Sequence, residues 1–581
     1  MAASGSTSGD EGCEAPLLPI ADDATVHGVV DYKDRRPVSR SNTGGWRSAG
    51  FIIGVEITER FAYYGIESNL ISYLTGPLQQ PMAMAAENVN AWSGAASILP
   101  LLGAFVADAW LGRYRAIIFS SLLYILGLSL LTLSAVLPSH GSSNNCHNTD
   151  NNTSCRPPQF QIILFFSSLY LVALGQGGHK PSVQAFGADQ FDVRHPQECK
   201  SRSSFFNWWY FGMCVGLMFT IPILTYIQDN LSWGFGFGIP CIAMAIGLAV
   251  FFLGTKTYRY SFNETKTNPF TRIVQVFVAA ARNWQIAYSP ASIDKEVGET
   301  LPRRGSNQFK FLDKALATAS DGSNKEWEVC SADQVEDAKA VLRLVPIWTT
   351  CLVYAIVFSQ PPTFFTKQGA TMDRSIGSGF EIPAASLQTL ITFSIVTFVP
   401  IYDRIIVPIA RFFTKRHSGF RMLQRIGTGM IFSTVAMVVA AIVEKQRLQI
   451  AIDSGLVDNP KATVPMSVWW LVPQYVLIGV ADVFTMVGLQ EFFYDQVPNG
   501  LRSLGLSLYL SIFGIGSFLS TFLISAIEKA TGGADQDSWF SNNINRAHID
   551  YFYWLLAGLS AIQLAFYLYF AKSYIYKGET I

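Results

Sequence analysis

The segment FIIGVEITERFAYYG at residues 51–65 is apolar enough to lie in a membrane, yet it carries Glu56, Glu59 and Arg60. A charge near the centre of a bilayer costs about 2.5–3.5 kcal/mol on insertion scales. The spacing i, i+3, i+4 places all three charges on one face of a helix. Two carboxylates beside one guanidinium leave a surplus negative charge, which favours sharing of a proton near neutral pH. This face is a candidate proton relay; the alternative is an ion pair that only fixes helix packing.

The composition is that of a membrane protein. Of the 581 residues, 50% are hydrophobic and 14% are charged, whereas soluble domains carry about 25% charged residues. The net charge of zero argues against a nucleic-acid partner. We find no nucleophile–base pair, nucleotide-binding loop or metal-ligand spacing, so the sequence gives no basis for an enzyme, a cofactor or a bound metal.

Apolar stretches of about 20 residues, the length that crosses a bilayer, recur along the whole chain. They predict an all-α membrane protein with twelve transmembrane helices in two six-helix bundles, the layout of the major facilitator fold. The predicted helices span residues 48–74, 89–110, 114–137, 159–183, 203–227, 234–254, 341–366, 381–403, 422–443, 467–494, 503–528 and 548–571. The predicted domains are a disordered tail (1–46), a first bundle (47–254), a linker with an amphipathic helix near Phe270–Trp284 (255–340), a second bundle (341–571) and a second tail (572–581).

Loop charges orient these helices. Arg113 and Arg115 follow the second predicted helix, whereas the loops after the first and fifth helices carry no Lys or Arg. Because basic loops stay in the cytosol, we expect both tails there. The first 46 residues hold no apolar segment of the kind that a cleaved signal peptide needs. Within them Leu17 and Leu18 follow an acidic cluster, so the pair is a candidate adaptor-binding signal or part of an ordinary tail.

A polar loop between the third and fourth predicted helices holds two possible modifications. Asn151 and Asn152 each begin a glycosylation sequon, and Cys146 and Cys155 flank them. If this loop faces a lumen, we expect a disulfide bond and a glycan there. Two free thiols and unused sequons are an equally open interpretation.

The segment GQGGHKP at residues 175–181 places a cation in the fourth helix. Its glycines let neighbouring backbones approach closely, and Lys180 needs a carboxylate or an anionic substrate if it is buried. Asp482 and Glu491 are the deep carboxylates of the second bundle, and we choose Glu491. A Lys180–Glu491 pair would join the bundles across the central cavity; the alternative is that Lys180 reaches the cytosolic interface.

Other polar residues complete the candidate site. Tyr63 and Tyr64 follow the three charges and either orient a substrate or fill an interface. His179 is interpreted as a packing residue rather than a proton site. Gln360 is a further candidate substrate contact. Candidate gating residues are Asp108, Arg113 and Arg115, which suit a charge clasp between the second and eleventh helices, unless the arginines serve only topology.

Together these segments resemble the plant nitrate and peptide transporter family (NRT1/PTR), which is part of the proton-dependent oligopeptide transporters, and most closely its fifth subgroup. The resemblance covers nearly all of residues 45–575 and rests on residues 56–65, 175–181, 186–192, 205–211 and 491–496. It implies that Glu56, Glu59 and Arg60 couple transport to protons and that Lys180 and Glu491 bind substrate. Two departures are Cys214, where the family often has Asn, and the lack of histidine in residues 341–366, where one nitrate-binding member has one. Nitrate would then be held weakly, by Lys180, Arg60 or Gln360.

The resemblance implies a proton-coupled symporter that moves nitrate or di- and tripeptides across a plant membrane toward the cytosol by alternating access. The expected partners are this substrate, protons and membrane lipid. We favour the vacuolar membrane over the plasma membrane. The alternatives are a proton-independent carrier of a hormone or glucoside, and a membrane sensor that does not transport.

Overall fold

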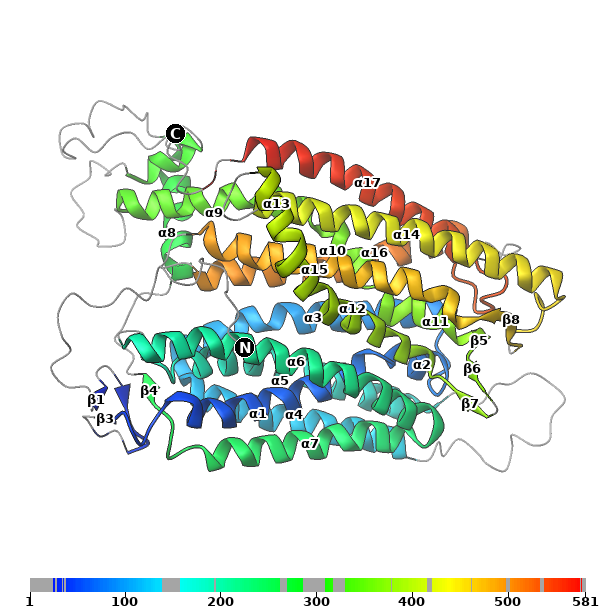
Figure 1. Ribbon diagram of the computed structural model, residues 1–581, viewed down its shortest axis with the longest axis horizontal. Helices are drawn as coiled ribbons and strands as arrows, with labels where there is room; N and C mark the ends of the chain where they lie inside the picture. The colour runs from blue at the N-terminus through cyan, green and yellow to red at the C-terminus, as the bar shows by residue number, and fades with distance from the viewer. Residues whose placement is uncertain are drawn as a thin grey trace.

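The computed structural model contains two groups of long helices that lie side by side (Figure 1). The first half comprises α1–α7 and the second half α9–α17, with α8 at the end where the second half begins. The structure describes residues 25–26, 29–33, 35, 38–137, 157–192, 195–261, 269–285, 309–316, 330–377, 379–414, 421–460, 462–497, 502–532, 538–574 and 576. Leu17, Leu18, Cys146, Asn151, Asn152 and Cys155 lie outside these residues.

The α-helices fall into the two halves in chain order. In the first half they are α1 (Gly45–Glu67), α2 (Leu70–Thr75), α3 (Met82–Val106), α4 (Arg113–Val136), α5 (Gln159–Ala188), α6 (Pro196–Asn230) and α7 (Trp233–Leu253). Then follow α8 (Pro269–Arg282), α9 (Ala332–Thr350), α10 (Leu352–Phe358), α11 (Thr366–Ala370), α12 (Thr389–Ile401), α13 (Val407–Thr414), α14 (Met422–Asp453), α15 (Val472–Asp495), α16 (Arg502–Thr531) and α17 (Ile549–Ser573).

Short helical turns and strands connect them. The turns are η1 (Ala107–Leu111), η2 (Asn283–Gln285), η4 (Lys310–Leu316), η5 (Pro361–Phe365), η6 (Ala384–Gln388), η7 (Tyr402–Ile406) and η8 (Val468–Leu471). The strand pairs are β1 (Thr25–Val26) with β3 (Val38–Ser39), β2 (Val29–Val30) with β4 (Tyr260–Ser261), β5 (Met372–Asp373) with β8 (Val464–Ser467), and β6 (Ser375–Ile376) with β7 (Phe380–Glu381). The pair β5–β8 is parallel, and the other three are antiparallel.

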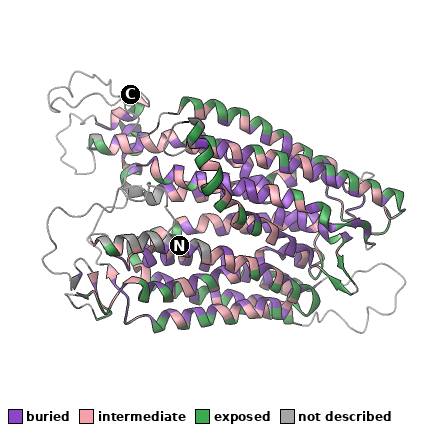
Figure 2. Ribbon diagram, viewed as in Figure 1, coloured by how far each residue is buried: buried purple, intermediate pink, exposed green. Residues whose placement is uncertain are grey.

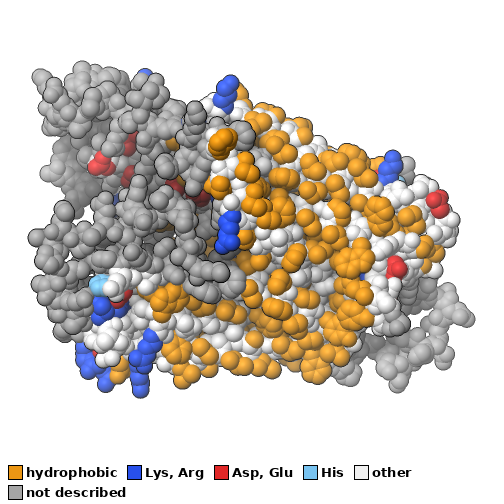
Figure 3. Space-filling model, viewed as in Figure 1, with side chains coloured by type: hydrophobic (Ala, Val, Ile, Leu, Met, Phe, Trp, Pro, Cys, Tyr) orange, Lys and Arg blue, Asp and Glu red, His pale blue; other side chains and the backbone are white. Residues whose placement is uncertain are grey.

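The helices have the length and surface of membrane spans. Among the described residues, 10 helices are long and apolar enough to cross a membrane, and a pair bent by 47°, Asp333–Thr350 with Leu352–Ala370, makes up to 11. The sequence predicts twelve spans. α1, which carries the three charges and packs against α5, α6 and α7, is not among these helices. Buried residues face the interior of each half (Figure 2), and on the face shown in Figure 3 hydrophobic side chains cover most of the described surface between the ends. Such a surface is stable against lipid rather than water.

Small residues set the distance between helices in the first half. A Cβ atom added at Gly175 would lie 2.8 Å from the backbone nitrogen of Tyr124, and one at Gly177 would lie 2.7 Å from Cβ of Leu99. Larger residues would therefore push α5 away from α4 and α3. The glycines of residues 175–181 predict such a close approach, and it packs α5 tightly against α4 and α3.

The two halves pack together along α3 and α16, and further hydrogen bonds join them at one end of the bundle. We call the end with β1–β4, α8 and α9 the tail end, and the end with α2, α11 and β5–β8 the far end (Figure 1). At the far end Lys367 Nζ donates to Thr75 Oγ1 at 2.9 Å, and Gln388 Nε2 donates to the Ser68 carbonyl at 2.8 Å. Asn90 also donates to Ser520, from α3 to α16, at 3.0 Å. These bonds close the far end across both halves.

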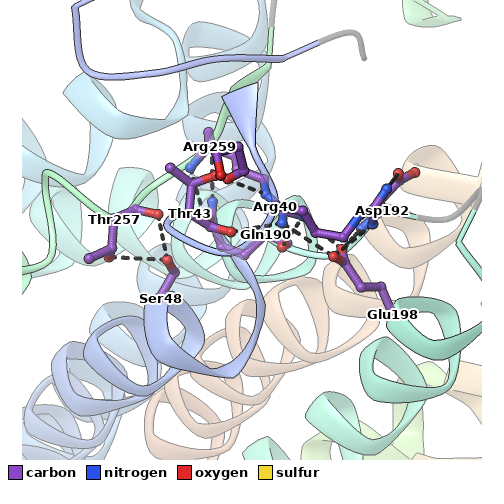
Figure 4. A network of polar contacts seen from close by, with 9 residues as sticks. Arg40, Thr43, Ser48, Gln190, Asp192, Glu198, Thr257 and Arg259 are labelled. Atoms are coloured by element: carbon purple, nitrogen blue, oxygen red, sulfur yellow. Dashed lines mark hydrogen bonds and ion pairs between the residues drawn. The ribbon is translucent and has the colours of Figure 1, made fainter. Parts of the chain in front are cut away.

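A polar network holds the tail end of the first half together (Figure 4). Arg259, 1% exposed, pairs with Glu198 at 2.7 Å and donates to the carbonyls of Thr43 and Gln190. Arg40 pairs with Glu198 at 2.8 Å and with Asp192 at 3.0 Å. The network, which we call the tail clasp, joins the segment before α1, the segment between α5 and α6, and the segment after α7.

Glu198 is the shared acceptor of the tail clasp, and it precedes the apolar part of α6, which begins at Gly212. Burial alone would raise the pKa of Glu198, but hydrogen bonds from Arg259, from the Asp192 backbone amide and from Arg40 hold that pKa below its ordinary value. The carboxylate is thus charged at neutral pH and binds both arginines.

Replacing Glu198 with Gln is expected to destabilise the folded protein, because the buried Arg259 loses its carboxylate partner. Removing one partner of a buried pair costs about 3–5 kcal/mol, and we expect the low end because Arg259 keeps its bonds to Thr43 and Gln190. Since the pKa of Glu198 is lowered in the folded state, its stabilising effect is present above the unfolded value of about 4.3 and is lost as the pH falls through the folded value. Thermal unfolding of the purified protein at about pH 7 and about pH 4 measures both effects.

Glu381→Gln is the matched control, because Glu381 is 68% exposed and pairs with Arg374 at 3.3 Å on the surface. Surface pairs contribute about 0–1 kcal/mol. If Glu198→Gln lowers the unfolding temperature no more than the control does, the tail clasp does not stabilise the fold.

Candidate functional site

The three charges of α1 share one buried face. Glu56, Glu59 and Arg60 are 3%, 0% and 4% exposed. The Nε atom of Arg60 donates to Glu56 Oε1 at 2.9 Å and lies 3.0 Å from Glu59 Oε2. One guanidinium nitrogen is therefore shared by two carboxylates, as the helical spacing predicts.

A second cation and a third carboxylate join this face. Lys180 on α5 interacts electrostatically with Arg60, Glu59, Glu56 and Glu67. Glu67 is not among the site residues predicted from the sequence. It lies seven positions after Arg60 and therefore about two turns along the same helix face. We call Glu56, Glu59, Arg60, Glu67 and Lys180 the charge cluster.

Two of the predicted substrate contacts lie next to the charge cluster. Tyr63 is 6% exposed, donates to Glu67 Oε1 at 3.0 Å and stacks on Trp92 with ring centroids 5.3 Å apart. Tyr64 packs edge-on against Tyr63 at 5.1 Å. Ser93 also donates to Glu67, at 3.1 Å. The hydroxyl of Tyr63 thus orients a carboxylate of its own helix.

The second half presents a different deep carboxylate from the one predicted. Glu491 has a side chain that is 36% exposed and pairs with Arg425 at 3.5 Å. The predicted Lys180–Glu491 ion pair is not among the ion pairs of the described residues, so this prediction is wrong for this conformation. Glu491 lies near the tail end of α15, where it remains accessible to solvent and to Arg425.

Asp482, the carboxylate that the sequence analysis set aside, is 3% exposed. Its Oδ1 accepts a hydrogen bond from the hydroxyl of Tyr354, which is 2% exposed and lies on α10. Gln360, between α10 and η5, is fully buried, and its amide donates to the Ile356 carbonyl of α10 at 2.7 Å.

The predicted gating residues are only partly described. Arg113 pairs with Asp189, which lies just after α5, so this contact stays within the first half. Arg115 is exposed, and the side chain of Asp108 lies outside the described part of the chain. Cys214, the departure on α6, is buried.

Comparison with known proteins identifies the family. The model of the POT family matches residues 114–540, more than half of the chain. The chain belongs to the POT family. Protein NRT1/PTR FAMILY 5.10 of Arabidopsis thaliana is 64% identical to this POT family transporter over 563 residues, 97% of each chain. Protein NRT1/PTR FAMILY 5.13 of the same plant is 57% identical over 553 residues, 94% of this chain and 97% of that protein. These relatives place the transporter in NRT1/PTR family 5 and confirm the resemblance predicted from its motifs.

Solved structures support the fold. An auto inhibited POT family peptide transporter matches with a TM-score of 0.68 at 21% identity, over 92% of this chain and 99% of that chain. The POT family transporter PepTSo matches with a TM-score of 0.65 at 20% identity, over 91% of this chain and 98% of that chain. The predicted all-α membrane fold of the major facilitator type is confirmed, and family membership makes the protein a multi-pass membrane transporter rather than an enzyme.

Replacing Tyr354 with Phe is expected to destabilise this POT family transporter, because the buried Asp482 loses the hydroxyl that donates to it. Leaving a buried acceptor without its donor costs about 1–3 kcal/mol. Adding Asp482→Asn to the Tyr354→Phe variant is expected to cost less than Asp482→Asn costs alone, since the two residues act as a pair. Thermal unfolding of the four proteins of this cycle gives the coupling energy.

Tyr551→Phe serves as the control, because Tyr551 is 48% exposed. Additive effects of the two substitutions at Tyr354 and Asp482 would show that their hydrogen bond contributes nothing to stability.

Proposed function

We propose that this POT family transporter is a proton-coupled symporter that moves nitrate or di- and tripeptides across a plant membrane toward the cytosol by alternating access. The observation that carries the proposal is the charge cluster. Glu56, Glu59 and Glu67 carry three negative charges when ionised, against two positive charges on Arg60 and Lys180. Binding of one proton neutralises the surplus, so the free energy of these buried groups depends on proton uptake.

The substrate class follows from the charges that a substrate would meet. Lys180 is the cation of the cluster that is not hydrogen-bonded to a carboxylate in the described residues, so an anionic group has a partner there. The amine of a peptide needs a carboxylate of the second half, and Asp482 suits this role better than Glu491 because it is buried. Tyr63, Tyr64 and Gln360 stay candidate contacts. The names of the relatives refer to the NRT1/PTR family, and several solved neighbours are named peptide transporters.

Alternating access is supported by the asymmetry of the contacts between the halves. The bonds of Lys367, Gln388 and Asn90 join the two halves at the far end. If the tail end faces the cytosol, as the loop charges predict, this conformation is closed on the opposite side. Rocking of one half against the other would then expose the charge cluster to each side in turn.

The membrane is part of the proposal. Both the vacuolar lumen and the cell wall are acidic, so a proton gradient drives symport toward the cytosol from either compartment. The acidic cluster before Leu17 and Leu18 favours the vacuolar membrane. The Leu17→Ala/Leu18→Ala variant is therefore used in experiments that need the protein at the cell surface.

Glu59→Gln is expected to remove gradient-driven uptake, because the site loses the carboxylate that binds the proton. Coupling between two ligands is typically about 1–3 kcal/mol, which predicts a loss of about 5–150-fold. Lys180→Ala is expected to remove uptake by a similar factor, since the anionic group of the substrate loses its cation. The measurement is the inward current of oocytes at about pH 5.5 with nitrate, a dipeptide or chloride outside.

Surface expression of each variant, checked by labelling, is the control. Uptake by Glu59→Gln that equals wild type would overturn proton coupling at this residue. If wild-type flux depends on neither pH nor membrane potential, a proton-independent carrier of a hormone or glucoside is favoured. Binding of the substrate without flux would favour a sensor.

A further inference from the structure

Several buried polar atoms of the charge cluster and of the neighbouring His179 have no hydrogen-bond partner among the described residues. Both oxygens of Glu59 and Oε2 of Glu56 lack a hydrogen-bond partner in the described part of the chain, although Glu59 Oε2 forms the ion pair with Arg60. His179 is 0% exposed, and neither of its ring nitrogens has a partner there. Buried polar groups of this kind are rare and require an explanation.

His179 lies directly beside these carboxylates. One oxygen of Glu56, one oxygen of Glu59 and one ring nitrogen of His179 all lie within 4.8 Å of one another. A hydrogen bond between an imidazole nitrogen and a carboxyl oxygen needs about 2.6–3.2 Å. Because α1 and α5 pack against each other, a small shift between the two helices brings these atoms into contact.

A proton suits this place better than a metal ion. The same three atoms would offer ligands to a divalent cation. However, Arg60 Nε already lies 2.9 Å from Glu56 and 3.0 Å from Glu59. Its positive charge repels a divalent cation at such short range. Arg60 also opposes an imidazolium at His179, but one added proton carries half the charge of a divalent cation and can be shared with Glu59 while Arg60 stays in place.

Three helices, α1, α3 and α4, pack against α5, which carries His179. α1 presents Glu56, Glu59 and Arg60 to His179. On α4 the buried Tyr124 hydroxyl, which lacks a hydrogen-bond partner among the described residues, interacts electrostatically with the same three groups. α3 packs on α5 through small and apolar residues near Gly177, and its single charged residue, Glu87, lies near the far end. Lys180 is the neighbour on α5 itself.

Counting charges shows where a second proton is needed. With its three carboxylates ionised the charge cluster has a net charge of −1, and one proton makes it neutral. A zwitterionic peptide adds no net charge, whereas nitrate adds one negative charge. A second proton then restores neutrality in a region where net charge is costly.

We propose that His179 is the second proton-binding residue of this site and that it is used when the substrate is a small anion. This inference rests on the proposed proton-coupled symport. In the transfer step a proton leaves a carboxyl oxygen of Glu59 and bonds to a ring nitrogen of His179. Glu59 becomes a carboxylate, His179 becomes an imidazolium, and no other bond changes. Glu59 is then free to take the second proton.

The test uses the full-length protein purified into liposomes, with nitrate as the probe. Nitrate accumulation under an imposed proton gradient is compared with nitrate exchange at equal pH on both sides, which needs no net proton transfer. For His179→Gln we expect accumulation to fall by about 5–150-fold, and by a larger factor than exchange, because only accumulation needs the second proton to be carried across. The slope of the logarithm of the accumulation rate against pH is expected to change from about two to about one, because that slope counts the protons bound.

Two further measurements separate this role from packing. His548→Gln is the matched control, because His548 lies at the start of α17 with a side chain that is 45% exposed; its slope is expected to equal that of wild type. With dialanine in place of nitrate, His179→Gln is expected to keep the wild-type slope, since a zwitterion needs only one proton.

His179→Asn is the second variant in case His179→Gln does not fold. Loss of exchange and accumulation to the same extent in the variants that fold would show that His179 only packs, and would overturn the proposal. If His179→Gln accumulates nitrate with the slope and the rate of wild type, the role of His179 is overturned, but the proposed symport is not. Wild-type protein that does not accumulate nitrate or dialanine would instead overturn the proposed function.

Discussion

The ion pairs of Arg60 with Glu56 and Glu59 constrain the whole first half of this POT family transporter. Charges in a membrane-spanning helix must be kept from lipid, and none of these three side chains is more than 4% exposed. The neighbouring helices must therefore enclose α1 tightly. Gly247 of α7 helps to make this possible, because a Cβ atom there would clash with the Thr58 side chain of α1. The close packing of the neighbouring helices is therefore what keeps the charges of α1 away from lipid.

The tail end and the far end of the molecule are held by different kinds of contact. At the tail end the clasp of Arg40, Glu198 and Arg259 joins three segments of the first half, so that half is braced as a unit. At the far end Lys367 donates to the neutral Thr75 hydroxyl, and Gln388 donates to the Ser68 carbonyl, so neither bond is an ion pair. Ion pairs within a half and uncharged helix packing between the halves, as between α3 and α16, are compatible with rigid-body rocking.

Two carboxylates of α15, Asp482 and Glu491, look equally suitable in the sequence but lie at different depths in the bundle. Asp482 and Glu491 lie nine positions apart on α15, which is about 14 Å along a helix at 1.5 Å per residue. That distance takes Glu491 to the tail end and to Arg425, whereas Asp482 stays buried against Tyr354. The sequence alone offers both as partners of Lys180, because it gives the order of residues but not which level of the bundle faces the opposite half.

The sequence by itself determined the membrane class, the long helices, the charged face of α1 and the family, because each depends on local composition, helical spacing or a contiguous motif. Only the tertiary structure decided which groups meet. Glu67 joins the charge cluster through Tyr63 and Ser93, His179 lies beside Glu56 and Glu59, and Glu491 pairs with Arg425. These partners lie on different helices or turns, and their contacts depend on the rotation and depth of each helix in the bundle. Those two quantities are set by packing among all the helices, which no local pattern encodes.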